Sequence, residues 1–269
     1  MSEEGRDLGF SEFKSIIDQL TQKKNYIPNL QLAVRGEPFM NRQAGQIISY
    51  AKEKGLYVLI NTNGLLLNPR LSTALIEAGL DMIIISIDGA TKDTYESMRK
   101  GGDFDTLLKN IRDLVKQKKG RGARLPFVEL QCIVSRKNER ELEKMNKLAL
   151  SLGVDNLRFK SYKVTCFDRD AGSIESLKKD LPDSLKYRRY LIKGGVLQPR
   201  SLPRVCSWAN DLIVYSNADV GACCEDFDKK YTCGNILRDG LWKVLHSKQR
   251  GQLKQKICKR ELEICKTCS

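Results

Sequence analysis

The sequence has a single histidine, His246, among its 269 residues. No Ser-His-Asp arrangement or histidine-rich metal site can be built around it, because it lies in L-W-K-V-L-H-S, which is typical of a helix face. The chain also lacks a G-x4-G-K-S/T phosphate loop and any apolar run long enough to span a membrane. Its N-terminus, M-S-E-E-G-R-D, is too polar for a signal peptide. We therefore expect a cytoplasmic protein that is neither a triad hydrolase nor a phosphate-loop enzyme.

The sequence has fewer acidic than basic residues. It contains 33 Asp and Glu and 47 Lys and Arg, which gives a formal net charge of +14. The densest basic runs are Lys116–Arg124 and Lys186–Tyr190. Such charge can mark a nucleic-acid surface, but no recognisable nucleic-acid module accompanies it. We interpret it as a solvated basic surface and expect no nucleic-acid partner.

Apolar periodicity alternates between strands and helices from residue 10 onward. Strands are expected at 30–34, 56–60, 82–87, 127–134 and 157–161, and helices at 10–20, 41–54, 69–78, 104–118 and 138–152. Asn41 is the expected cap of the second helix, and Asn138 with Glu141 resembles a capping box for the last. This alternation predicts an α/β protein with a parallel sheet, open or curved into a barrel. Its site should lie at the carboxyl ends of the strands.

Polar turns follow the first three expected strands: R-G-E-P, N-T-N-G and S-I-D-G. They bring Gly36, Glu37, Asn63, Ser86 and Asp88 to one edge of the sheet. A carboxylate there can accept hydrogen bonds from an ammonium group, while Ser and Asp suit ribose hydroxyls. Each motif alone is common turn chemistry. Their occurrence at three successive strand ends favours a binding site.

Cysteine is absent from the first 131 residues and concentrated in the last 64. The C-terminal cysteines are Cys206, Cys223, Cys224, Cys233, Cys258, Cys265 and Cys268. A hairpin within 206–224 should bring Cys206 close to one of the adjacent pair, and Cys265-x2-Cys268 has the spacing of a ligand knuckle. In a reducing compartment this pattern favours metal ligation over disulfides. The spacing fits zinc and an iron–sulfur cluster equally well.

The two halves together resemble the radical S-adenosylmethionine enzymes that carry a C-terminal SPASM or shorter twitch extension. The resemblance rests on G-E-P, T-N-G and S-I-D-G-A-T-K-D-T-Y-E-S-M-R, and on C-x17-C, G-N-I-L-x4-W and C-x2-C in the tail. It implies an incomplete (β/α)6 partial barrel of the TIM type over residues 1–165, with the first strand missing. A linker over 166–200 with one helix near 182–192, and a small cysteine-rich α+β domain over 201–269, should follow.

The resemblance also implies ligands. Gly36 and Glu37 would meet the amino group of S-adenosylmethionine, and Ser86 and Asp88 its ribose. One auxiliary 4Fe–4S cluster would be held by four thiolates, from Cys206, Cys224, Cys265 and Cys268. Spacing selects Cys224 over Cys223, although the reverse assignment stays open.

The defining C-x3-C-x2-C motif of these enzymes does not occur in the sequence. We therefore expect the C-terminal portion of an enzyme that abstracts hydrogen from a peptide or carbohydrate-like small molecule. This chain would contribute no catalytic residue and would bind S-adenosylmethionine only when the N-terminal segment is supplied. Without that segment the strand at 30–34 is an exposed edge, which predicts aggregation unless a fragment or subunit covers it.

Two alternatives compete with this interpretation. The absent motif also fits a non-catalytic iron–sulfur protein that binds a partner or relays electrons. The +14 charge and the knuckle also fit a zinc-stabilised basic module that binds nucleic acid.

Overall fold

A computed structural model describes residues 7–22, 29–32, 36–163, 174–201, 206–226, 228–265 and 268. The chain forms two compact units. The sheet unit comprises Ile27–Tyr162 and Lys179–Arg188, and the cysteine unit comprises Met1–Tyr26, Lys163–Lys178 and Arg189–Ser269. Within the described residues, no helix is long and apolar enough to cross a membrane.

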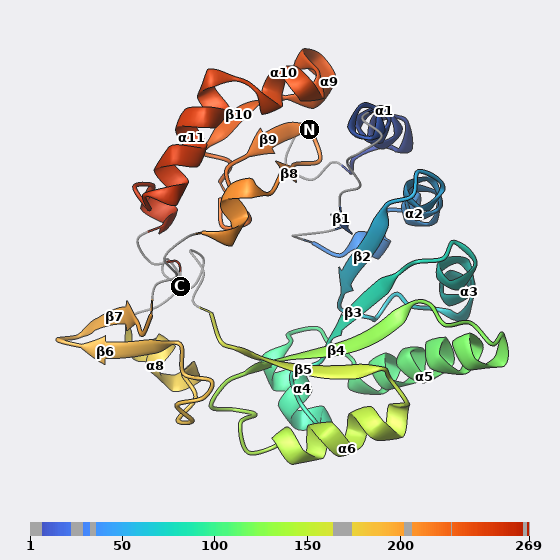
Figure 1. Ribbon diagram of the computed structural model, residues 1–269. Coiled ribbons are helices and arrows are strands. Elements are labelled where there is room, and N and C mark those ends of the chain that lie inside the picture. The colour runs from blue at the N-terminus through green and yellow to red at the C-terminus, as the bar shows by residue number, and fades with distance from the viewer. Residues whose placement is uncertain are drawn as a thin grey trace. The chain divides into compact units, whose positions relative to one another are not determined.

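The sheet unit contains five parallel strands, as expected from the sequence, and they lie side by side in chain order. They are β1 (Asn29–Leu32), β2 (Tyr57–Thr62), β3 (Met82–Ser86), β4 (Phe127–Val134) and β5 (Asn156–Ser161). The helices are η1 (Pro38–Met40), α2 (Ala44–Glu53), α3 (Pro69–Glu77), α4 (Lys92–Met98), α5 (Phe104–Gly120) and α6 (Leu142–Leu152). Parallel neighbours joined by right-handed crossovers in one direction put the connecting helices on one face. Figure 1 shows α2, α3, α5 and α6 along that face.

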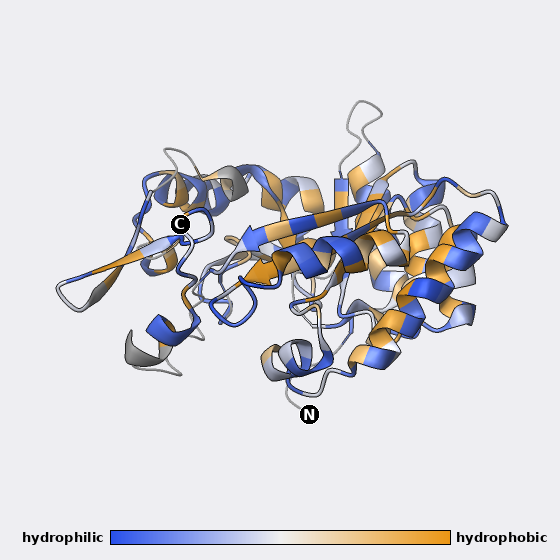
Figure 2. Ribbon diagram, turned by 90° about the horizontal axis from the view of Figure 1, so that it is seen from below, coloured by the Kyte–Doolittle hydropathy of each residue, from blue (hydrophilic) through white to orange (hydrophobic). Residues whose placement is uncertain are grey.

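The strand register separates an apolar face from a polar one. Ile83 and Ile85 of β3 pair with Val128 and Leu130 of β4, and all four are fully buried. Side chains alternate along a strand, so the residues between them point the other way. On that opposite face Ser86 pairs with Gln131, which pairs with Arg158. Figure 2 shows the matching pattern in the helices, which carry both hydrophobic and hydrophilic residues.

Four local expectations from the sequence are wrong. Helix α2 begins after Gln43 and not at Asn41, whose side chain instead accepts a hydrogen bond from the Gln43 N–H. Helix α6 has Glu141 at its N-cap without a side-chain cap, so Asn138 and Glu141 form no capping box. The short helix α4 was not expected.

The segment after β5 also differs from the expectation. The helix expected near 182–192 is absent; helix α8 spans Ile174–Asp180, and β6 (Tyr190–Lys193) pairs with β7 (Val196–Pro199). Gly194 and Gly195 between the strands both have positive φ. Two glycines flanked by apolar residues are a strong hairpin signal, which outweighs weak helical periodicity here.

The cysteine unit joins the two ends of the chain. Its three-stranded antiparallel sheet has the order β10 (Thr232–Asn235), β9 (Asp219–Gly221) and β8 (Ile213–Val214), which confirms the expected hairpin. The other elements are α1 (Phe10–Thr21), η2 (Ser207–Asn210), α9 (Ile236–Asp239), α10 (Leu241–Leu245), α11 (Lys248–Cys258) and η3 (Glu263–Cys265). Ile16 of α1 joins the buried cluster that includes Val220, Ile236 and Leu241.

Candidate cofactor and cluster sites

Glu37 lies at the carboxyl edge of the sheet and is held by the end of β2. Its Oε1 accepts hydrogen bonds from Thr62 Oγ1 at 2.7 Å and from the Phe39 N–H at 3.3 Å. Its Oε2 accepts one from the Asn63 N–H at 2.8 Å. A carboxylate has about four acceptor positions, so these three bonds orient Glu37 and leave capacity for one more donor. Gly36, just before it, is exposed and has φ +70°.

The T-N-G motif forms the turn that binds Glu37. The Gly64 N–H donates to Thr62 Oγ1 at 3.0 Å, and the Leu65 N–H donates to Asn63 Oδ1 at 2.9 Å. Gly64 has φ +77°, and a Cβ there would lie 2.6 Å from Leu107 Cδ1. Both the backbone conformation and the lack of space therefore require glycine at this position.

Ser86 and Asp88 follow β3, the neighbour of β2, but their environments differ. Ser86 is half-buried on the polar face of the sheet. Asp88 is only 5% exposed: its Oδ1 accepts from the Ile133 N–H at 2.7 Å, and its Oδ2 binds Arg99 Nε at 2.8 Å and Nη2 at 2.7 Å. The sequence patterns did not predict a role for Arg99, although it is the last residue of the motif S-I-D-G-A-T-K-D-T-Y-E-S-M-R.

Five cysteines surround one small cavity in the cysteine unit. The cavity holds about 20 Å³ and is lined by Cys206, Cys223, Cys224, Glu225, Ile257, Arg260, Ile264, Cys265 and Cys268. All four predicted ligands are in this group, together with the second member of the adjacent pair. Cys132, Cys233 and Cys258 do not line it.

The two adjacent cysteines have different neighbours. The pKa of the Cys223 thiol is raised to about 11, chiefly by burial; a hydrogen bond from the Glu225 backbone N–H opposes this shift, and the charges of Cys265 and Cys268 add to it. Burial raises the pKa of Cys224 to about 12, followed by the charge of Glu225, whose Oε1 lies 3.8 Å from Cys224 Sγ. Both cysteines line the cavity with Cys265 and Cys268, and Cys224 Sγ also lies 3.8 Å from Glu225 Oε1.

Thiols dominate the donor set, and they suit both zinc and an iron–sulfur cluster. No three histidine, cysteine, aspartate or glutamate side chains in the described part of the chain are arranged to hold one metal ion. In a 4Fe–4S cluster each thiolate binds a different iron, so its ligands lie farther apart than those of one ion. The 20 Å³ cavity is the size of a water molecule, so a cluster would require the cysteine-bearing segments to separate.

Two cationic side chains lie beside these thiols. Lys163 Nζ is 2.7 Å from Glu225 Oε1, and Arg260 donates a hydrogen bond to the carbonyl of Cys268. Burial lowers the pKa of Lys163, but Glu225, Cys268 and Cys224 raise it more, so that its net shift is upward. Cationic groups at this position would offset the negative charge of a thiolate-bound cluster.

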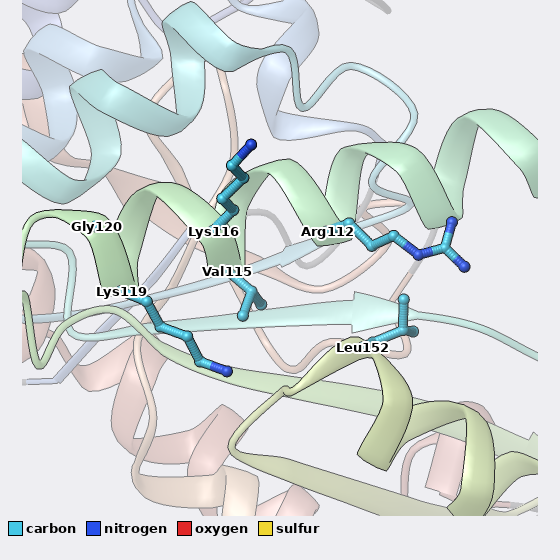
Figure 3. A pocket seen from close by; sticks show the side chains of 6 residues that line it. All are labelled: Arg112, Val115, Lys116, Lys119, Gly120 and Leu152. Carbon is cyan, nitrogen blue, oxygen red and sulfur yellow. The ribbon is translucent and has the colours of Figure 1, made fainter.

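A larger hollow of about 580 Å³ lies between α5 and α6. It is lined by Arg112, Val115, Lys116, Lys119, Gly120 and Leu152, which Figure 3 shows. Helix α5 ends just before β4 begins, so this stretch lies at the opposite edge of the sheet from Ser86. The lining has basic and apolar side chains but no carboxylate, thiol, hydroxyl or imidazole group.

Two domain families match the sequence. The Radical SAM superfamily matches residues 3–154, and the SPASM iron-sulfur cluster-binding domain matches residues 206–269.

Curated relatives are distant. A probable GTP 3',8-cyclase of Sulfurisphaera tokodaii is 26% identical over 220 residues, which cover 76% of this chain and 68% of the relative. An AdoMet-dependent heme synthase of Methanosarcina barkeri is 35% identical over 119 residues, 44% of this chain and 32% of the relative. The mycofactocin maturase MftC of Mycolicibacterium smegmatis is 24% identical over 256 residues, 87% of this chain and 61% of the relative. The chain therefore spans less than two thirds of the last two.

Solved structures share the fold at low sequence identity. Streptococcus suis SuiB matches with a TM-score of 0.66 and 12% identity, over 94% of this chain and 63% of that one. Native anSMEcpe with bound AdoMet matches with a TM-score of 0.61 and 15% identity, over 97% of this chain and 79% of that one. Since the superfamily match covers more than half of its residues, the chain belongs to the Radical SAM superfamily.

Proposed function

We propose that this chain works in radical S-adenosylmethionine chemistry on a peptide or small carbohydrate-like molecule, with one auxiliary 4Fe–4S cluster in its cysteine unit. The observation that carries the proposal is the cavity lined by five cysteine side chains. When bound, the cofactors of this family supply the radical chemistry that removes a hydrogen atom from a substrate. The sequential parallel sheet with helices on one face supports a partial (β/α)6 barrel.

The residues of the sheet unit would bind S-adenosylmethionine. Glu37 would accept a hydrogen bond from the ammonium group of the methionine moiety, because it is oriented and retains an acceptor position. Ser86 would meet the ribose. Asp88 is nearly buried and paired, so we propose that it acts by positioning Arg99.

The cluster ligands would be Cys206, Cys265, Cys268 and one of the adjacent pair. Sequence spacing favours Cys224, and both Cys223 and Cys224 line the cavity. Because metal binding displaces thiol protons, the raised pKa values of Cys223, Cys224 and Cys265 predict proton release on assembly.

The cluster that cleaves S-adenosylmethionine needs thiolates from outside this sequence, which lacks C-x3-C-x2-C. We propose that an N-terminal fragment or a subunit supplies them. Strand β1 is an edge strand of the described sheet, and such an edge is where another segment could pair.

The test is the iron, acid-labile sulfide and zinc content of the full chain after anaerobic reconstitution. We expect about four iron and four sulfide per chain, and little of either in Cys265→Ser/Cys268→Ser. Cys258→Ser is the matched control, because Cys258 is exposed in the same unit and does not line the cavity.

Single variants Cys223→Ser and Cys224→Ser identify the fourth ligand, since only the ligand's loss should deplete iron. About one zinc without sulfide in the unmodified chain would overturn the proposal in favour of a structural zinc knuckle.

A further inference from the structure

The ion pair between Lys163 and Glu225 lies directly beside the cysteine cavity. Glu225 lines the cavity, and its Oε1 is 2.7 Å from Lys163 Nζ and 3.8 Å from Cys224 Sγ. One carboxylate oxygen thus lies between an ammonium group and a cavity thiol. The two side chains are 25% and 17% exposed, so water screens their charges only in part.

The pair is of a different kind from the surface ion pairs of the chain. It joins residues 62 positions apart and is about as buried as Lys52–Asp81, whereas Lys14–Asp18 and Lys147–Glu143 are exposed pairs within single helices. Partly burying two charges costs solvation free energy that their attraction only partly returns. Stability alone is therefore a weak reason to hold this pair beside the thiols.

We propose that Lys163 and Glu225 balance each other beside the auxiliary cluster, so that the reduction potential of the cluster is not shifted by either charge alone. This rests on the proposed function, because it requires a cluster bound by the cavity cysteines. Reduction adds one negative charge to a cluster, so a nearby cation stabilises the reduced form and a nearby anion destabilises it. Paired, the two side chains nearly cancel; unpaired, each acts with its full charge.

The experiment is an anaerobic redox titration of the reconstituted full chain, followed by electron paramagnetic resonance. Lys163→Met leaves the Glu225 carboxylate unbalanced and should make the midpoint potential more negative. Glu225→Gln leaves the Lys163 ammonium unbalanced and should make it more positive. The double variant should return close to the unmodified value, and Lys163→Arg should stay close to it.

Lys230→Met is the matched control. Lys230 lies in the same unit, is 55% exposed and makes only 3.9 Å contacts with Asp228 and Glu263, so its loss should leave the potential unchanged. A purely structural pair would lower stability in both single variants without shifting the potential in opposite directions.

The outcomes separate the two proposals. If the unmodified chain assembles four iron and the single variants show no shift, or shifts of the same sign, this inference is overturned while the proposed function stands. If Lys163→Met loses its cluster, Glu225→Gln decides: a more positive potential supports the inference, and an unchanged one overturns it. If the unmodified chain assembles no cluster, the proposed function itself fails.

Discussion

At the scale of single residues, Asn138 is the clearest case of a side chain whose role depends on distant partners. It is fully buried; its Oδ1 accepts from the Ser135 N–H at 2.8 Å, and its Nδ2 donates to the carbonyls of Asp88 and Ile133, each at 2.9 Å. It thereby ties the end of β3, where the candidate cofactor residues lie, to the end of β4. From the sequence it looked like a helix cap.

We expect Asn138→Ala to lower the free energy of unfolding of the sheet unit by about 2 to 4 kcal/mol, because two carbonyls lose their buried donor. Asn138→Asp keeps the shape but points a carboxylate at those carbonyls, which should raise its pKa above that of an unfolded aspartate. Its extra destabilisation should therefore be present at neutral pH and shrink as the pH falls. Urea unfolding from pH 4 to pH 8 checks both; equal stability of Asn138→Ala and the unmodified chain would contradict the role.

At the scale of elements, the turns after the strands were readable from sequence because their signals are local. G-E-P, T-N-G and S-I-D-G were identified as strand ends, and all three lie at the carboxyl edge. The sequence did not predict which partners these residues bind. Glu37 accepts a hydrogen bond from the turn after β2, and Asp88 pairs with Arg99. Those contacts depend on the pairing register between strands, and a short stretch of sequence does not specify that register.

Gly64 of the T-N-G turn should be costly to replace with alanine, and Gly79 is the matched control. Gly64 and Gly79 have φ of +77° and +70°, but only Gly64 is crowded: a Cβ would lie 2.6 Å from Leu107 Cδ1 and 2.9 Å from Ile85 Cγ2. Gly79→Ala should cost about 1 kcal/mol, the strain of a left-handed alanine. Gly64→Ala should cost about 2 to 4 kcal/mol, because overpacking adds to that strain. Chemical denaturation of the two variants measures the difference, and equal costs would refute the packing contribution.

At the scale of the whole molecule, the sequence predicted five parallel strands but not the path of the chain between units. Helix α1 was grouped with the sheet because it precedes the first strand. In the structure it packs against α9 and α10 of the cysteine unit, where Gln19 Oε1 accepts a hydrogen bond from the Leu241 N–H at 2.7 Å. The amphipathic pattern of α1 predicts that one face is buried but cannot say against what, since the partner is more than 200 residues away in the chain.

Because α1 packs in the cysteine unit, a core mutation in α1 should lower the stability of that unit. Ile16 is 6% exposed and packs in the cluster of the cysteine unit, so Ile16→Ala should destabilise that unit by about 2 to 4 kcal/mol. Both tryptophans, Trp208 and Trp242, belong to the cysteine unit, so their fluorescence in urea should report the loss. Hydrogen exchange of the β3 amides should stay unchanged, because β3 lies in the sheet unit.

Ile111→Ala is the converse control, since Ile111 is fully buried in α5 of the sheet unit. It should accelerate exchange in β3 and leave the tryptophan transition in place. If Ile16→Ala loosened β3 instead, α1 would belong with the sheet, as its position in the chain first suggested. If it shifts only the tryptophan transition, the cluster-binding unit depends on both ends of the chain, and a fragment that begins after β5 would lack part of its hydrophobic core.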